Sequence, residues 1–474
     1  MEYNNIILIS YIISAILFIL GIKKLGKVHT ARQGNFLSAI GMLIAISATF
    51  LKMEAMPLNW IIAGIGLGVI IGVISATKVA MTAMPEMVAI FNGFGGGASA
   101  LVASAELLKY LQDTKLYTDK LLETNSSLSI TMFTIVISVL IGTVTFTGSF
   151  IAWGKLQGKI SGQPITYPGQ NIINGLILIA VIIASYFFIS NPNDINTFYI
   201  IIGIGLLLGI LSVIPIGGAD MPVVISLLNS YSGIAAAATG FVLQNQALIV
   251  SGCLVGASGI FLTNIMCKGM NRSLSNVLFS AFGKTDEKSS TSNNEKDITI
   301  KEMSAENAAY TMQSAESVII VPGYGMAVAQ AQHEVRKFAD ELEKEGVSVK
   351  FAVHPVAGRM PGHMNVLLAE ANISYEKLFD MDEINDDFSG ADVALIIGAN
   401  DVVNPAARHD ESSPIYGMPI LNVDYAKTTF VLKRSMNPGF AGISNELFGY
   451  ENNYMVFGDA KATISQFVET LKEE

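Results

Sequence analysis

The sequence has little charge and almost no cysteine, and both shortages narrow what the protein can be. Only 14% of its 474 residues are charged, against about 25% in an ordinary soluble domain. Its two cysteines are Cys253 and Cys267; a helix would hold them roughly 21 Å apart, which excludes a disulfide between them. No cysteine cluster that could hold zinc or an iron–sulfur centre is present, and we expect no metal site. Much of this chain must therefore lie in something other than water.

The charges that are present are divided unevenly along the chain. Residues 1–283 carry 13 lysines and arginines and nine acids, a net charge of +4, whereas residues 284–474 carry 16 and 30, a net charge of −14. The first part is an apolar block and the second is an acidic globular domain. A domain with this charge repels nucleic acid, so we expect no DNA or RNA partner.

Nine apolar stretches of the first part approach the ~20 residues that cross a lipid bilayer. The chain starts Met1-Glu2-Tyr3, without a basic segment or a small-residue cleavage site, so we interpret the first stretch as a retained span and not as a signal peptide. The stretches are 5–22, 36–53, 60–77, 84–108, 128–153, 171–190, 198–214, 221–243 and 247–266.

Basic residues gather on alternate loops between these stretches. By the positive-inside rule such loops are cytoplasmic, which predicts an N-terminus outside the membrane and a C-terminal domain in the cytoplasm. An odd number of spans requires the same arrangement. The basic residues concerned are Lys23, Lys24, Lys27, Arg32, Lys78, Lys155, Lys159, Lys268 and Arg272.

The second part alternates strand and helix patterns after a polar segment at 284–304, which is typical of a flexible linker. We therefore divide the chain into a transmembrane domain (1–283), the linker (284–304) and a soluble domain (305–474). Expected strands are Ser317–Val321, Ser348–Val353, Val393–Ile397, Pro419–Val423, Phe430–Lys433 and Tyr454–Phe457, and expected helices are Ala327–Glu345 and 460–472. The alternation predicts a Rossmann-like α/β fold with a doubly wound parallel sheet. Dinucleotides bind such sheets at the carboxyl ends of the strands.

A glycine-rich loop follows the first of these strands and opens a helix. Two glycines there permit a tight turn and a close approach of the backbone to phosphate, although Val328 stands where the common fingerprint has a third glycine. A plain strand–helix turn is the alternative interpretation. The segment is Gly323-Tyr324-Gly325-Met326-Ala327-Val328.

The ends of two other strands favour NADP over NAD. The second strand ends Val353-His354-Pro355, without the acid that binds the ribose 2′-hydroxyl in NAD-selective folds. Lys433, Arg434 and Ser435 follow another strand, and two cations with a hydroxyl suit a 2′-phosphate. A solvated surface pair is the alternative.

Two further glycine-rich segments follow strands and should lie at the same edge of the sheet. Arg359 could meet pyrophosphate or ribose, and Asp401 could face the nicotinamide end or a neighbouring domain. For Asp401 a helix N-cap is the alternative. The segments are Val356-Ala357-Gly358-Arg359-Met360-Pro361 and Gly398-Ala399-Asn400-Asp401-Val402.

Ionisable and amide side chains inside the apolar block are few, and their cost in a membrane suggests function. Glu86 and Asn92 lie on the fourth span, Asp220 opens the eighth, and Asn229 lies deeper on it. We expect them to form a proton relay, with an N-cap as the alternative for Asp220 and interhelical hydrogen bonds for the asparagines. The glycine runs 93–97 and 252–259 indicate close helix packing.

These residues together resemble the beta subunit of proton-translocating nicotinamide nucleotide transhydrogenase, over nearly the whole chain. The resemblance implies a Re/Si-specific translocase that moves hydride from NADH to NADP⁺, driven by inward proton flow. NADP(H) would bind the C-terminal domain, and NAD(H) would bind a separate alpha subunit. The resemblance rests on residues 217–233, 323–332, 354–365, 381–388, 398–406 and 433–437.

The resemblance also implies roles for individual residues. Residues 323–328 and 356–361 would line the dinucleotide, and Lys433, Arg434 and Ser435 would hold the 2′-phosphate. A lid over NADP(H) would be formed by Met436–Gly442, with Gly439, Phe440, Ala441 and Gly442. Asp401 would link the nucleotide state to proton movement, and Asp220 and Asn229 would take part in proton coupling. No side chain is expected to act as a chemical catalyst, because hydride passes directly between the cofactors.

Two positions depart from the family pattern, and the assembly remains open in one respect. Asn92 stands where some relatives have histidine, which a partner helix could supply, and Phe440 stands where some have tyrosine. We expect an alpha partner of one or two chains in a symmetric dimer of alpha–beta units, in a bacterial cytoplasmic (inner) membrane. The alternative function is a transporter or channel with an NADP redox-sensing domain. Electron transfer to quinone is a weaker alternative, because no flavin or metal site is visible.

Overall fold

The computed structural model describes residues 2–26, 30–52, 58–79, 81–115, 118, 127–162, 164–270, 273–279, 299–359, 362–411, 413, 415–437 and 443–472. The chain forms two compact units, residues 1–263 and 264–474, and each is described by itself. The predicted linker falls mostly on residues 284–298, which lie outside the described ranges, so its boundaries stay a prediction.

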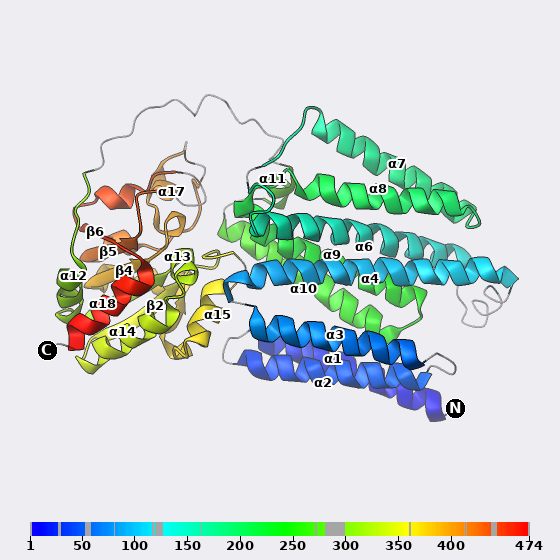
Figure 1. Ribbon diagram of the computed structural model, residues 1–474, viewed down its shortest axis with the longest axis horizontal. Coiled ribbons are helices and arrows are strands. Elements are labelled where there is room, and N and C mark those ends of the chain that lie inside the picture. Colours follow the sequence, from blue (N-terminus) through cyan, green and yellow to red (C-terminus); the bar gives the residue numbers. More distant parts are fainter. Residues whose placement is uncertain are drawn as a thin grey trace. The chain divides into compact units, whose positions relative to one another are not determined.

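Nine helices in the described part of the chain are long and apolar enough to cross a membrane, and they confirm the nine predicted stretches. Many of them run side by side in the first unit (Figure 1). The helices are α1 (Glu2–Leu25), α2 (Ala31–Lys52), α3 (Leu58–Lys78), α4 (Met84–Gln112), α6 (Leu128–Leu156), α7 (Gln170–Ser190), α8 (Ile195–Val213), α9 (Met221–Val242) and α10 (Gln246–Gly269).

Helix α9 lies at the centre of this unit, because 72% of its apolar window is buried whereas none of α3's is. It packs against α6 and α4, which also pack against each other. Glycines of the two predicted runs allow close crossings: a methyl group at Gly96 on α4 would lie 2.7 Å from the carbonyl oxygen of Gly142 on α6, and one at Gly252 on α10 would lie 2.7 Å from that of Gly233 on α9. The predicted role of the glycine runs in helix packing is thus confirmed.

The second unit contains a six-stranded sheet in which every neighbouring pair is parallel. The strand order is β3-β2-β1-β4-β5-β6, so the chain reverses direction across the sheet between β1 and β4. That reversal is the switch point at which doubly wound folds bind ligands. The strands are β1 (Ser317–Pro322), β2 (Ser348–Val353), β3 (Leu378–Asp380), β4 (Val393–Ile397), β5 (Thr428–Lys433) and β6 (Asn453–Phe457).

Helices cover this sheet, and α14 (Gln332–Lys344) packs against α18 (Ala460–Lys472). The rings of Phe338 and Phe467 meet there with centroids 5.3 Å apart. The remaining helices of the unit are short: α11 (Leu274–Phe279), α12 (Ala305–Gln313), α13 (Tyr324–Val328), α15 (His363–Glu370), α16 (Met381–Ile384) and α17 (Ala406–His409).

The helix expected at Ala327–Glu345 is wrong as a single element, because it is broken into α13 and α14. Gln330 has a φ of 50°, a left-handed conformation that ends a helix. The Ala331 N–H then bonds back to the carbonyl oxygen of Met326 (3.0 Å). This bond closes the first helix before the second begins.

The strand expected at Pro419–Val423 is also wrong, although its apolar side chains are buried as the pattern indicates. Its backbone pairs with other loops and not with a strand: the Leu421 N–H bonds to the carbonyl oxygen of Val402 (3.0 Å), and the Asn422 N–H bonds to Oδ1 of Asn385 (3.0 Å). A 3₁₀ turn over Val423–Tyr425 follows. The edge strand β3, only three residues long, escaped prediction.

Candidate functional site

Two loops meet at the switch point of the sheet, one after β1 and one after β4. The Gly323 N–H bonds to the carbonyl oxygen of Ile397 and the Gly325 N–H to that of Gly398, both at 2.9 Å. A methyl group at Gly325 would lie 2.6 Å from the Cα of Gly398, and Gly398 has a φ of +65°, a conformation that favours glycine. Backbone therefore lies against backbone here. The glycines at 323 and 325 are thus required by the contact between the two loops, and their predicted close approach to phosphate stays a prediction.

Two buried histidines, His354 just after β2 and His363 at the start of α15, have ring nitrogens with defined roles. Nε2 of His354 donates to the carbonyl oxygen of Pro419 (2.8 Å), and its Nδ1 accepts from the Val356 N–H (3.3 Å). Nδ1 of His363 accepts from the Arg359 N–H (3.0 Å), and Gly358, with a φ of +111°, allows the turn between them. Burial lowers the pKa of His354 to about 4 although its bond to Pro419 opposes this. Burial, with the nearby Arg359 cation, also lowers the pKa of His363 to about 4.

Arg359 and Tyr324 join the loops after β1 and β2. The Arg359 guanidinium lies 4.5 Å from the centroid of the Tyr324 ring, and that ring lies 6.0 Å from the His363 ring. Because Nδ1 of His363 is an acceptor, the neutral ring carries its proton on Nε2. That nitrogen is buried, and no described residue forms a hydrogen bond with it. A buried donor of this kind suits a polar ligand group.

Lys433, at the end of β5, reaches across to the loop after β4. Its Nζ donates to Oδ1 of Asn400 (3.3 Å) and to the carbonyl oxygen of Asn437 (2.6 Å). Nδ2 of Asn400 in turn donates to Oδ1 of Asp401 (2.9 Å). Burial lowers the pKa of Lys433, and the Asp401 carboxylate opposes this shift. Asp401 is the first residue of a 3₁₀ turn whose N-cap is Asn400, so Asp401 is not the N-cap that was its alternative interpretation.

The rest of the predicted phosphate site and lid is less enclosed. Arg434, Ser435 and Met436 are exposed, and Oγ of Ser435 accepts from the Asn437 N–H (3.4 Å). The solvated interpretation of the basic pair thus fits Arg434 but not Lys433. Six predicted site residues lie outside the described ranges: Met360, Pro361, Gly439, Phe440, Ala441 and Gly442.

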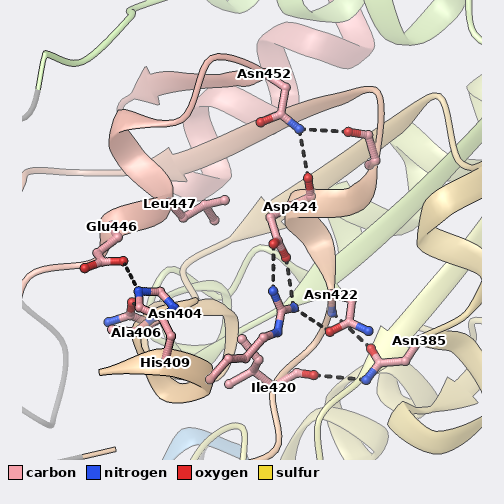
Figure 2. Close-up of polar contacts among 12 residues, drawn as sticks. Asn385, Asn404, Ala406, His409, Ile420, Asn422, Asp424, Glu446, Leu447 and Asn452 are labelled. Atoms are coloured by element: carbon pink, nitrogen blue, oxygen red, sulfur yellow. Dashed lines mark hydrogen bonds and ion pairs between the residues drawn. The ribbon is translucent and has the colours of Figure 1, made fainter. Parts of the chain in front are cut away.

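A polar network holds the segment 419–425 behind these loops (Figure 2). Nη1 and Nη2 of Arg408 donate to the Asp424 carboxylate at 2.7 and 3.0 Å, and Nη2 also donates to Oδ1 of Asn422. Nδ2 of Asn452 donates to the Asp424 carbonyl oxygen (3.0 Å). Through Pro419 and Leu421 this segment bonds to His354 and Val402, so it fixes the loops after β2 and β4 relative to each other.

Sequence reasoning missed three residues that shape this edge: His354, His363 and Asn445. Nδ2 of Asn445 donates to the carbonyl oxygen of Asn400 (3.0 Å). A usable signal existed for the histidines, because two of the five in the whole chain fall within one glycine-rich segment. Asn445 follows the lid segment and carries no comparable signal. No group of three or more His, Cys, Asp or Glu side chains able to hold a metal occurs among the described residues.

The polar residues predicted in the membrane unit lie at the same end of neighbouring helices. Oε2 of Glu86, in the first turn of α4, accepts from Nε2 of Gln157 just after α6 (3.2 Å). Nδ2 of Asn92 donates to the carbonyl oxygen of Ile225 in the first turns of α9 (3.1 Å), which is the interhelical bond of its alternative interpretation. Asn229 is half-buried one turn further along α9.

Asp220 occupies the N-cap position of α9, but its side chain makes no capping hydrogen bond to the first turn. It is 9% exposed and is the last residue of a 3₁₀ turn over Gly218–Asp220. Asp220 therefore has the position of the N-cap that was its alternative interpretation, without the side-chain hydrogen bond of a cap. A function in proton coupling remains a prediction for these residues.

Comparison with known proteins assigns the whole chain. The family model described as NAD(P) transhydrogenase beta subunit matches residues 7–470. Two relatives named NAD(P) transhydrogenase subunit beta, one from Rhodospirillum rubrum and one from a specified strain of it, are each 48% identical over 473 residues, 99% of this chain and 99% of theirs. The chain therefore belongs to the NAD(P) transhydrogenase beta subunit family, in which hydride transfer between nicotinamide nucleotides is coupled to proton translocation across a membrane.

Proposed function

We propose that this chain binds NADP(H) at the carboxyl ends of β1, β2, β4 and β5, and that it couples Re/Si-specific hydride transfer from NADH to NADP⁺ to inward proton flow. The observation that carries the proposal is the contact between Gly323, Gly325 and Gly398 at the switch point. Side chains there would push apart the two loops at the edge of the sheet where such folds bind dinucleotides.

The residues around that contact fit NADP(H). Lys433 and the adjacent Arg434 provide two cations for a 2′-phosphate, and no acid follows β2 to select an unphosphorylated ribose. Arg359 and Tyr324 offer a cation and an aromatic ring, and Nε2 of His363 offers a buried donor. Nicotinamide supplies the hydride chemistry when it is bound. The side chains of this chain bind and orient it.

As a beta subunit, the chain works with an alpha partner. We infer that this partner, of one or two chains, carries NAD(H), because this chain has a single dinucleotide-type sheet among its described residues. Two alpha–beta units would form a symmetric dimer in a bacterial cytoplasmic membrane. The C-terminal domain would face the cytoplasm.

Proton coupling would use acids and amides at one end of the membrane helices. We infer that Glu86, Asp220, Asn92 and Asn229 hold the proton or the water that relays it. Asp401 would report the nucleotide state, because it bonds to Asn400, which contacts the proposed phosphate ligand Lys433. None of these groups is required to act as acid or base on the nicotinamide itself.

The test is hydride transfer from NADH to thio-NADP⁺ in sealed vesicles that contain this chain and its partner, with and without an imposed proton gradient. We expect the gradient to stimulate transfer in the wild type and not in Asp220→Asn. Transfer that ignores the gradient would contradict coupling. Absence of any transfer from protein that binds NADP⁺ would favour the redox-sensing transporter instead.

A further inference from the structure

Lys155 is a buried lysine that no part of the proposed function yet uses. It lies in the last turn of α6, after 31 residues without a charge (124–154), and it is 4% exposed. Lys159, four residues later, is exposed and lies 4.2 Å from the centroid of the Trp153 ring. From their place in the sequence, Lys155 and Lys159 are both predicted to be basic residues of a cytoplasmic loop. A cation buried at this point requires partners inside the protein.

The partners include two backbone carbonyl groups just beyond the end of α8. Nζ of Lys155 donates to the carbonyl oxygen of Ile214 (2.6 Å) and to that of Ile216 (2.7 Å). Ile214 is the C-cap of α8. The last carbonyl groups of a helix lack intrahelical donors and carry the negative end of its dipole. Lys155 therefore satisfies acceptors that the helix end leaves open.

The segment that Lys155 holds leads directly to Asp220. Three residues separate Ile216 from Asp220, and two of them are the glycines Gly217 and Gly218, which give the backbone unusual freedom. The Gly218 N–H bonds to the carbonyl oxygen of Gly162 (2.8 Å), and the Ile165 N–H bonds to that of Ile214 (3.4 Å). These two bonds join the loop after α6 to the turn before α9, next to the contacts that Lys155 makes.

The same junction reaches Glu86. Gln157, two residues after Lys155, donates from Nε2 to Oε2 of Glu86. The end of α6 therefore contacts both the side chain of one proposed proton-coupling acid and the turn that carries the other. A shift of this end would move Glu86 and Asp220 together.

We propose that Lys155 is a positioning residue for proton coupling, which fixes the turn 214–220 so that Asp220 stands in its working place relative to Glu86. The inference rests on the proposed function for its meaning in catalysis. The structural part of the inference, which we call the clamp, is the pair of hydrogen bonds from Lys155 to the carbonyl oxygens of Ile214 and Ile216. Lys155 touches neither nucleotide nor, in this proposal, the transferred proton.

Three variants separate positioning from simple folding. Lys155→Met removes charge and donors at similar length, Lys155→Gln keeps a neutral donor, and Lys155→Arg keeps both. Lys159→Met is the matched control, because it removes a neighbouring cation that makes no contact with the turn among the described residues. NADP⁺ binding and hydride transfer by the detergent-solubilised complex report folding.

Gradient stimulation in vesicles reports coupling. We expect Lys155→Met and Lys155→Gln to bind NADP⁺ like the wild type and to lose about tenfold or more of the stimulation. Lys155→Arg should recover most of it, and Lys159→Met should lose none. Full stimulation in Lys155→Gln would overturn the proposal. So would a loss of binding in Lys155→Gln as large as its loss of stimulation, since that indicates a general folding role.

Hydrogen exchange of the full chain tests the clamp without any turnover. Amides of residues 214–222 should exchange faster in Lys155→Gln than in the wild type and in Lys159→Met, while those of β1 and β4 should not change. Unchanged exchange at 214–222 would sink the proposal even if coupling fell. If exchange at 214–222 is faster in Lys155→Gln but wild-type vesicles show no gradient response, the clamp is supported and the proposed coupling is refuted.

Discussion

Lys433 is already held in place at the proposed nucleotide-binding edge. Its ammonium group donates to Asn400 and to the Asn437 carbonyl group. Its Nζ lies 5.0 Å from the centroid of the Phe448 ring. Most of the side-chain entropy that binding would cost is therefore already lost in the free protein. A lysine held in this way recognises a phosphate with little further ordering.

Replacing Lys433 should change nucleotide preference. We expect Lys433→Met to weaken NADP⁺ binding about 10- to 100-fold, since a hydrogen bond to a charged group contributes about 1.5–3 kcal/mol. Weak NAD⁺ binding, which lacks the 2′-phosphate, should not change. Calorimetric titration of the purified chain measures both. Lys461→Met, on the exposed face of α18, is the control, and equal losses for the two nucleotides would contradict the assignment.

His354 is fixed as the neutral tautomer with its proton on Nε2. A second proton would go to Nδ1, which faces the Val356 N–H, another donor. This geometry and the burial of the ring explain the direction of its pKa shift. Since the pKa falls from 6.5 in the unfolded chain to about 4 in the fold, the stability that the neutral ring contributes is complete above pH 6.5. It is lost as the pH falls from there toward 4.

We therefore expect acidification to destabilise the C-terminal unit through His354. At about pH 5 the loss should be about 2 kcal/mol relative to neutral pH. Pulse proteolysis of the full chain in urea measures the free energy of unfolding at each pH. His354→Gln should remove this part of the pH dependence, whereas His333→Gln, an exposed histidine on α14, should retain it. Identical pH profiles for the wild type and His354→Gln would refute the assignment.

At the scale of elements, the sequence was most informative where a local pattern alone decides the structure. The nine spans, the strands Ser348–Val353 and Val393–Ile397 and the last helix follow from apolar length or β-branched runs. Pro419–Val423 has the same apolar pattern, but its backbone N–H groups form hydrogen bonds with Asn385 and Val402, which are distant in sequence. The break at Gln330 depends on one φ angle. No single-sequence pattern contains either fact.

The candidate site residues likewise divide into those that a local sequence pattern predicts and those that it does not. Its glycines and Lys433 follow strands, and that position is readable from the chain. The partners of Lys155 include two carbonyl oxygens about sixty residues away, and main-chain atoms leave no signature in the sequence. The role of His354 likewise depends on the carbonyl group of Pro419. Residues that bind backbone are therefore the ones that sequence reasoning misses.

Helix α8 offers a matched pair of glycines that tests the close helix crossings. A methyl group at Gly209 would lie 2.5 Å from the carbonyl oxygen of Val144 on α6, whereas one at Gly203 would meet nothing within 4 Å. We expect Gly209→Ala to destabilise the membrane unit by about 1–3 kcal/mol through overpacking. Gly203→Ala should be neutral or slightly stabilising, because alanine favours a helix.

Thermal unfolding of the two variants in the same detergent, followed by size-exclusion chromatography, makes the comparison. The Gly209→Ala midpoint should fall by several degrees and the Gly203→Ala midpoint should not. Equal midpoints would mean that α8 can move away from α6 at no cost.

At the scale of the whole molecule, the orientation in the membrane rests on fewer charges than the sequence suggests. Lys155 is buried against α8, so it satisfies helix carbonyl groups and is a poor marker of a loop. Lys23, Lys24, Lys78, Lys159 and Lys268 remain at alternate ends of the spans. By the positive-inside rule they still predict that the starts of α4 and α9, with Glu86 and Asp220, lie on the cytoplasmic side.

Labelling with a membrane-impermeant maleimide tests this orientation. In a background of Cys253→Ser and Cys267→Ala, Asn193→Cys in the α7–α8 loop should react in intact cells. Lys159→Cys, in the α6–α7 loop, should react only in inverted vesicles. The reverse pattern would place Glu86 and Asp220 at the outer face of the membrane. These two acids could not then release protons into the cytoplasm, where the C-terminal unit is synthesised. The predicted pattern would require a proton that enters from outside to pass along the helix crossings of α4, α6 and α9 before it reaches either acid.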